Sequence, residues 1–128
     1  MDDHGRFAGM VRACDHEAIE TARPRVAPDH LPGLVELYGN LASWEQRLGL
    51  IQLVQDRSEP ALAPIMLDVL RAPDRDDDLA DLTKAVALCY LDQNHDKFAT
   101  YYQDRDALNR AVDEALRANG LKPAPPEN

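Results

Sequence analysis

The chain has 128 residues, of which 45% are hydrophobic but only 5% aromatic, and its 14 basic against 23 acidic residues give a net charge of −9. This length predicts one domain with a single core, and the hydrophobic fraction excludes wholesale disorder. The negative charge argues against nucleic acid and against an anionic membrane surface as partners, because both need Lys and Arg. It favours a basic protein partner, with acidity that serves only solubility as an equal alternative.

Seven helices are predicted between proline and glycine residues. In chain order they cover approximately residues 4–22, 29–39, 44–56, 59–72, 77–93, 96–102 and 104–119. Apolar residues recur at helical spacing in these segments, and no run alternates as a strand would. The proline-rich segment 121–128 is expected to be a disordered tail, so the predicted domain covers residues 1–120.

Cap residues mark several of these helix ends. Asp29 and Ser58 are expected to cap the second and fourth helices, and Ser43 with Gln46 forms a capping box for the third. Gly120 predicts a left-handed end for the last helix. The third helix is apolar over more than half of its circumference, so we expect it in the middle of the array.

Two stretches look like imperfect copies of one helical hairpin. The first copy has the apolar set Leu31, Leu34, Val35 and Tyr38, which recurs 31 residues later as Leu62, Ile65, Met66 and Val69. Each set is followed by a second helix, and Arg47 in the first of these helices corresponds to Lys84 in the other. A repeated helix pair predicts an all-α fold, a short α-solenoid or α-hairpin array of about six or seven helices. Such arrays usually work by binding another molecule.

This repeat resembles the HEAT-like repeat family. The segment Leu31-Pro-Gly-Leu-Val-Glu-Leu matches the first helix of that family, and Arg47 and Lys84 stand where the family has a basic residue. The family pairs this residue with an Asp about six positions earlier. Asp78 takes that place for Lys84, whereas Leu41 takes it for Arg47.

The resemblance covers residues 31–93 and implies a scaffold or binding module whose second helices line a concave surface. The candidate partner-binding residues are the polar positions of those helices, the acidic loop before the fifth helix and two aromatic residues. They are Trp44, Glu45, Gln52, Asp56, Asp76, Asp77, Asp78, Asp81, Lys84 and Tyr101. The alternatives are an ordinary solvated face for the polar residues and a core position for Trp44.

No residue pattern predicts chemistry. The histidines, His4, His16, His30 and His95, form no His-x-x-x-His or Glu-x-x-His pair on one helical face, and the aspartates of the acidic loop lack the Gly and Glu of a calcium loop. Neither a phosphate-binding loop nor a nucleophile elbow occurs. We therefore expect no metal, no cofactor and no enzymatic activity.

Cys14 and Cys89 lie far apart among apolar neighbours, which favours two buried reduced thiols. No signal peptide or membrane-spanning run is evident, so the sequence predicts a soluble cytoplasmic protein.

The leading hypothesis for the function is a non-enzymatic protein-binding module. Its most concrete form is an acidic immunity-type inhibitor, a monomer or weak dimer, that neutralises a basic toxin or effector domain by direct binding. An adaptor or accessory subunit of a larger assembly is the alternative and would need an apolar docking patch. A small helical enzyme or ligand carrier is the third possibility.

Overall fold

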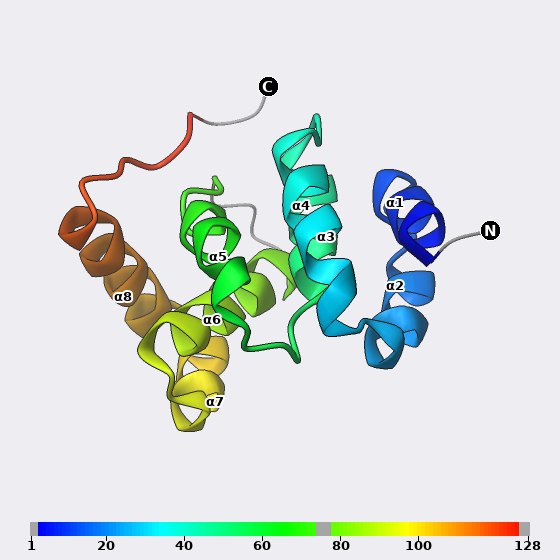
Figure 1. Cartoon of the computed structure of the whole chain (residues 1–128). Coiled ribbons are helices and arrows are strands. Elements are labelled where there is room, and N and C mark those ends of the chain that lie inside the picture. Colours follow the sequence, from blue (N-terminus) through cyan, green and yellow to red (C-terminus); the bar gives the residue numbers. More distant parts are fainter. Residues whose placement is uncertain (1–2, 74–77, 126–128) are drawn as a thin grey trace. The chain divides into compact units, whose positions relative to one another are not determined.

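The computed structural model describes residues 3–73 and 78–125. Throughout these residues the fold is all-helical, with no strand, as the sequence predicted (Figure 1). The chain divides into two compact units, Met1–Ile65 and Met66–Asn128. Among the described helices, none has the length and apolar character needed to cross a membrane.

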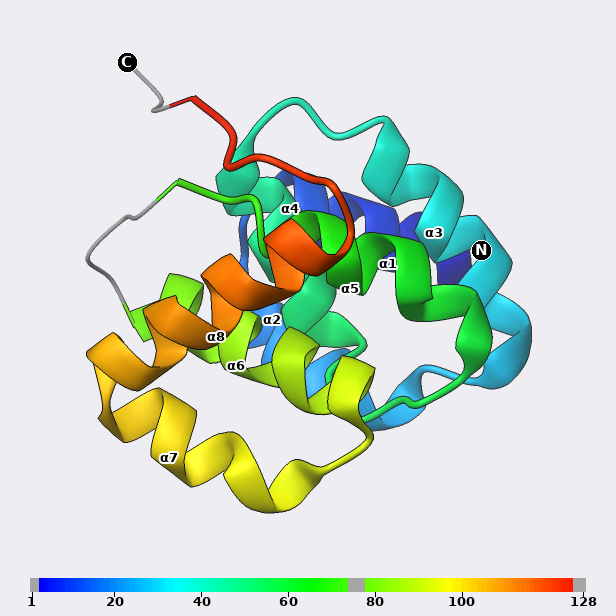
Figure 2. The ribbon, with the colours of Figure 1, turned by 90° about the vertical axis from the view of Figure 1, so that its left-hand side faces the viewer.

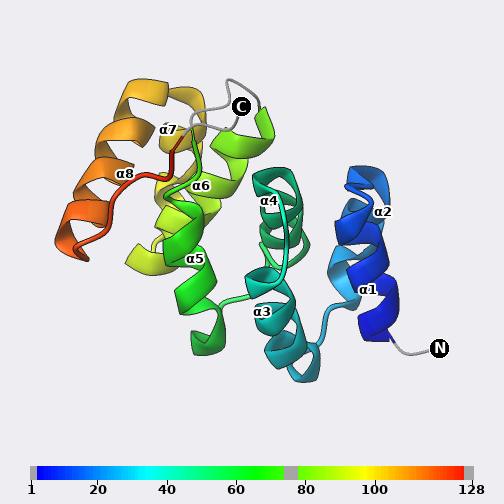
Figure 3. The same cartoon turned by 90° about the horizontal axis from the view of Figure 1, so that it is seen from above.

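The first unit is built from four α-helices. They are α1 (Asp3–Arg12), α2 (His16–Ala22), α3 (Leu31–Gly39) and α4 (Trp44–Leu53). Short 3₁₀ turns occur at Arg23–Arg25, Pro28–His30 and Pro60–Leu62. Helix α1 packs beside α2, and α3 packs beside α4 (Figure 3). Because α4 also contacts α1 and α2, it is the central helix of this unit.

The apolar sequence of α4 explains its central place. Seven of its ten residues are buried, and Leu48 and Ile51 are fully enclosed. Burying one such side chain stabilises the fold by roughly 1.5–3 kcal/mol. Within its unit α4 lies between neighbours, whereas its predicted place in the middle of the whole array stays a prediction. It ends at Leu53 rather than near residue 56.

The second unit contains α6 (Asp78–Asp92), α7 (Phe98–Gln103) and α8 (Arg105–Ala118), with a 3₁₀ turn at His95–Lys97. Helix α5 (Ala63–Val69) spans the boundary between the units. Helices α6, α7 and α8 all contact one another (Figure 2). Their shared core includes the buried residues Ala85, Leu108, Val112 and Leu116.

The single helix predicted over residues 4–22 is wrong, because α1 and α2 are separate helices. Cys14 lies between them with a φ of 52°. The N–H of Asp15 donates to the carbonyl of Met10 at 3.0 Å and ends α1. The Asp15 carboxylate then accepts from the N–H of Ala18 at 3.1 Å and starts α2.

The predicted caps have mixed outcomes. The capping box is confirmed, since Ser43 Oγ accepts from the N–H of Gln46 at 3.2 Å and Gln46 Oε1 accepts from the N–H of Ser43 at 3.3 Å. The predicted caps at Asp29 and Ser58 are wrong. In both places a proline-initiated 3₁₀ turn precedes the α-helix, and neither predicted residue caps it. At the Pro28–His30 turn the N–H of Ala27 instead donates to Nδ1 of His30 at 2.9 Å.

Left-handed residues end three of the helices. Gly120 has a φ of 68° after α8, as predicted, and its N–H donates to the carbonyl of Arg117 at 3.2 Å. Gln93 has a φ of 53° after α6, and its N–H donates to Tyr90 at 3.2 Å. Cys14 ends α1 in the same way. Only Gly adopts this conformation without steric cost.

The described part of the predicted tail, residues 121–125, has no regular secondary structure but is bound to its own unit. Arg71 Nε donates to the carbonyl of Lys122 at 3.0 Å, and the N–H of Ala124 donates to the carbonyl of Arg71 at 2.8 Å. These bonds hold a segment that the sequence predicted to be disordered.

Candidate functional site

Three of the predicted partner-binding residues lie together on and just after α4, and they meet three residues of α2 and its C-terminal end. We call this set the α2–α4 polar face. It consists of Glu45, Gln52 and Asp56 with His16, Glu20 and Arg23. All six belong to the first unit.

Gln52 is the centre of the α2–α4 polar face. It was expected on a solvated face, but only 7% of it is exposed. Its Nε2 donates to Glu20 Oε2 at 2.8 Å, and its Oε1 lies 3.2 Å from His16 Nδ1. Because the Gln52 oxygen accepts, Nδ1 of His16 is the protonated nitrogen in this arrangement. Nε2 of His16 then faces Glu45 Oε1 at 3.6 Å.

Arg23 closes the other end of the face. Its Nε donates to Asp56 Oδ2 at 2.8 Å, and its Nη1 donates to Glu20 Oε1. Partial burial lowers the pKa of Arg23, but the bonds and charges of Asp56 and Glu20 outweigh it, so the pKa of the guanidinium lies above its usual value. The guanidinium therefore stays charged and fixes both carboxylates.

A glycine allows α2 and α4 to approach closely enough for these bonds. A Cβ on Gly49 would lie 3.2 Å from Cδ1 of Ile19 and 3.7 Å from Cε1 of His16. Ile19 is fully buried, so it has little room to move. The backbone of Gly49 thus sets the distance across which Gln52 and Glu20 bond.

The exposed atoms of the face are mainly carboxylates. The side chains of Glu20, Glu45 and Asp56 are 53%, 48% and 55% exposed, whereas that of Arg23 is 23% exposed. Of these three half-exposed carboxylates, Glu20 and Asp56 bond the guanidinium of Arg23, whereas Glu45 lies beside His16. They can accept charge-assisted hydrogen bonds from Lys or Arg side chains.

The residues that α2 contributes were not among the predicted site residues. His16, Glu20 and Arg23 are spaced as i, i+4 and i+7 and therefore lie on one side of a helix. That polar stripe was a usable signal.

Trp44 is buried, with 7% of it exposed. The guanidinium carbon of Arg47 lies 4.7 Å from the centre of its ring, a cation–π geometry. Arg47 Nη2 also donates to the carbonyl oxygen of Leu41 at 3.1 Å. The main chain of residue 41 thus supplies the acceptor for Arg47.

The remaining candidates are scattered over the second unit. Asp78 is exposed and Tyr101 half-buried. Asp81 Oδ2 lies 3.3 Å from Arg105 Nε and joins α6 to α8. Lys84 is only 7% exposed, so it does not point into solvent as its place on a polar face predicted.

Asp76 and Asp77 lie outside the described residues. Cys89 is buried, as predicted, whereas Cys14 is only half-buried, and among the described residues neither cysteine forms a disulfide.

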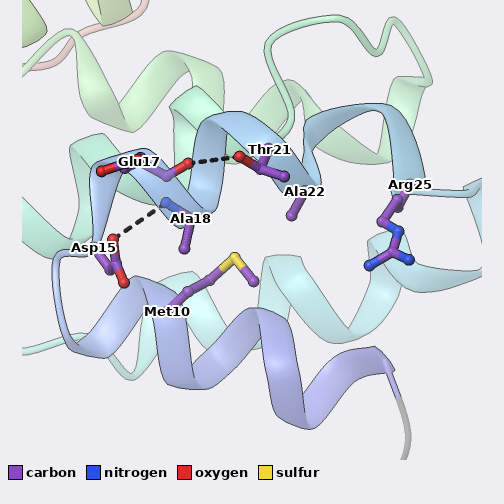
Figure 4. Close-up of a pocket in the computed structure, with 7 residues that line it drawn as sticks. All are labelled: Met10, Asp15, Glu17, Ala18, Thr21, Ala22 and Arg25. Carbon is purple, nitrogen blue, oxygen red and sulfur yellow. Dashed lines mark hydrogen bonds between the residues drawn. The ribbon is translucent and has the colours of Figure 1, made fainter.

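A shallow groove of about 410 Å³ borders α2 on its other side (Figure 4). Met10, Ala18 and Ala22 contribute apolar surface, with Asp15 near one end and Arg25 at the other. Within the groove, the Thr21 hydroxyl donates to its own helix at Glu17.

Among the described residues no group of three or more His, Cys, Asp or Glu side chains is arranged to hold a metal ion. No protein-family model, curated protein or solved structure matches this chain.

Proposed function

We propose that this chain is a non-enzymatic protein-binding module that holds a basic protein on the α2–α4 polar face. The observation that carries this proposal is the set of three half-exposed carboxylates, Glu20, Glu45 and Asp56. Bonds from Gln52 and Arg23 already order Glu20 and Asp56, so little side-chain entropy is lost when a partner binds.

Charge supports a basic partner. The net charge of −9 attracts such a partner over distances comparable to the Debye length, and the fixed carboxylates then receive its Lys and Arg side chains. The most concrete form of this function is an immunity-type inhibitor that covers a basic toxin or effector domain. Salt should weaken the complex, because long-range attraction between exposed charges is screened.

The HEAT-like α-solenoid remains the architecture that we propose for this module. The repeated apolar positions support it. Leu31, Leu34 and Tyr38 of the first copy are buried, and so are all four positions of the second copy. The bond from Arg47 to the main chain of residue 41 gives further support, because it replaces the expected Asp.

The test is retention of partners by the tagged protein from lysate of its own source, at low and at high salt. The test variant is Glu45→Lys with Asp56→Lys. The control is Asp29→Lys with Glu36→Lys, which makes the same charge change at exposed residues of the same unit. We expect one stoichiometric basic partner that high salt and the test variant release and the control retains. Loss from both variants alike, or no retained partner, would contradict the proposal.

An adaptor subunit is the second candidate, favoured by a different observation. Tyr102 of α7 is 37% exposed, and its ring meets that of Phe98 edge to face at 5.7 Å between centroids. No residue of α7 is buried. Exposed aromatic residues commonly anchor protein interfaces. If the protein is an adaptor subunit, Tyr102→Ala should release the partner and high salt should not.

A further inference from the structure

The shallow groove between α1 and α2, which we call the α1–α2 groove, offers apolar surface to a partner (Figure 4). Met10 and Ala18 line it and are only half-buried, and Thr21 beside them is exposed. Ile19, on another side of α2, is fully buried and lies close to Gly49 of α4. The groove is therefore a side of α2 that α4 does not cover.

Charges of opposite sign stand at the two ends of the α1–α2 groove. Asp15 and Glu17 lie at one end and Arg25 at the other, and all three residues are exposed. The Asp15 carboxylate bonds its own helix at Ala18, whereas the side chains of Glu17 and Arg25 make no hydrogen bond or ion pair with any other described residue. A complementary partner therefore carries the same two charges in the reverse order.

The groove residues that follow one another along α2 are spaced symmetrically. Asp15 lies three residues before Ala18, Arg25 lies three residues after Ala22, and the two alanines are four residues apart. This spacing places all four residues along one side of a helix. In an antiparallel pair of such helices, one register sets Ala18 opposite Ala22. The same register sets Asp15 opposite Arg25, so the stripe is complementary to a second copy of itself.

Small side chains at the centre of this stripe allow a second helix to approach. Ala18 and Ala22 each carry only a methyl group, and the distance between packed helices depends on the side chains at their contact. Met10 of α1 flanks them, and its unbranched side chain can adapt to a facing helix. Two α1–α2 pairs packed in this way form a four-helix bundle, with α2 of each copy in the groove of the other.

We propose that the α1–α2 groove binds a second copy of this chain, with the two α2 helices antiparallel about a twofold axis. Asp15 and Glu17 of each copy then face Arg25 of the other, and the two sets of charges pair at once because a twofold interface uses the same residues of both copies. The net charge of −9 on each copy opposes association, so the dimer is weak. This inference does not depend on the protein-binding function, because the α2–α4 polar face uses another side of α2.

Sedimentation equilibrium of the full chain tests for the dimer. At about 0.15 M salt the Debye length is about 8 Å, so repulsion between the net charges is screened while neighbouring charges still attract. We expect a reversible equilibrium between monomer and dimer with a Kd of about 1 mM or lower. A chain that stays monomeric at a concentration of about 1 mM would overturn the proposal.

Charge exchange tests the surface. One variant is Arg25→Glu, and the other is Asp15→Ser with Glu17→Arg, in which Ser can keep the helix cap. Each variant alone should dimerise at least about tenfold more weakly, because like charges then face each other. An equimolar mixture of the two should recover the dimer, since each variant supplies the charge that the other lacks. Undiminished dimerisation of either variant alone, or no recovery in the mixture, would overturn the proposal. If the double variant fails to fold by circular dichroism, Glu17→Arg alone takes its place in the mixture.

Matched controls separate this surface from a general effect of charge. The control for the double variant is Asp29→Ser with Glu36→Arg, and the control for Arg25→Glu is Lys97→Glu. Both make the same charge changes at exposed positions outside the groove and should dimerise as the unmodified chain does. Tyr102→Ala removes the exposed ring on α7 and should also leave the dimer unchanged. A dimer that Tyr102→Ala abolishes and Arg25→Glu retains would place the interface on α7 and overturn the proposal.

Discussion

Gly49 of α4 lies so close to Ile19 of α2 that a Cβ on Gly49 would stand 3.2 Å from Cδ1 of Ile19. Two effects therefore oppose each other in Gly49→Ala. Alanine favours the helix by up to about 1 kcal/mol, whereas overpacking against a fully buried side chain typically costs about 1–3 kcal/mol. We expect a net loss of about 1 kcal/mol in the free energy of unfolding, measured by urea denaturation.

Gly9 of α1 provides the matched control, since a Cβ there would meet no atom within 4 Å. Gly9→Ala should raise the free energy of unfolding by about 0.5–1 kcal/mol, because only the helix preference changes. If both variants gain stability equally, α2 and α4 do not approach as closely as the structure indicates.

Gln93→Gly should stabilise the protein. Gln93 has a φ of 53° and its side chain is exposed, so the substitution relieves backbone strain and removes little packing. We expect the free energy of unfolding to rise by about 0.5–1 kcal/mol. Glycine removes the steric cost of the left-handed conformation, and the extra chain entropy of Gly in the unfolded state offsets part of this gain. Gly120→Ala, at the equivalent position after α8, should lower the free energy of unfolding by about 1 kcal/mol. Urea denaturation of the two variants measures both changes. A lower free energy of unfolding for Gln93→Gly would contradict the left-handed conformation of Gln93.

Gln52→Ala separates a structural role from a partner-binding role. Removing the amide leaves Glu20 and His16 without the bonds that it makes at 2.8 and 3.2 Å. We expect the free energy of unfolding to fall by about 1–3 kcal/mol. Glu45→Ala, which loses only a 3.6 Å contact at the surface, should change it by less than about 0.5 kcal/mol. Equal losses would mean that Gln52 does not organise the face.

Thiol chemistry should distinguish Cys14 from Cys89. Burial raises the pKa of the Cys89 thiol, and the charge of Asp92 adds to this while Lys97 partly opposes it. We expect a disulfide reagent at about pH 8 to modify the half-buried Cys14 quickly and Cys89 only as the protein unfolds. Cys14→Ser should remove the fast phase and Cys89→Ala should keep it, so a fast phase of two thiols would contradict the assignment.

The same shift gives a pH dependence. Because the folded protein retains the Cys89 proton to a higher pH than the unfolded chain, the free energy of unfolding should fall as pH rises above the ordinary thiol pKa of about 8.5. The fall should continue until the pH passes the raised pKa of the folded state. Cys89→Ala should flatten this alkaline slope in urea denaturation, and an unchanged slope would assign it to other groups.

The local signals in the sequence predicted local structure only in part, since the caps expected at Asp29 and Ser58 are not formed. The capping box of Ser43 and Gln46 and the helix end at Gly120 both follow from short-range hydrogen bonds, and both are present. The break at Cys14 could not be predicted in this way. A cysteine with positive φ carries no sequence signal, and here the hydrogen bond between Asp15 and Met10 favours it.

The candidate site depended on contacts between helices and was predicted only in part. Glu45, Gln52 and Asp56 share a helical face, but the burial of Gln52 results from α2 packing against α4. Lys84 is buried through its place in the second unit, where it borders the same groove as Leu116 of α8. Periodicity identifies one face of a helix, but it does not identify what covers that face.

The bond between Ala124 and Arg71 turns one amide into a direct reporter on the attachment of the C-terminal segment. The N–H of Ala124 lies outside any helix, yet its bond to the carbonyl of Arg71 shields it from exchange with deuterated water. Exchange at this position requires residues 122–125 to detach from Arg71. When the segment recloses faster than the amide exchanges, the rate of deuterium uptake at Ala124 therefore gives the equilibrium between its attached and detached forms.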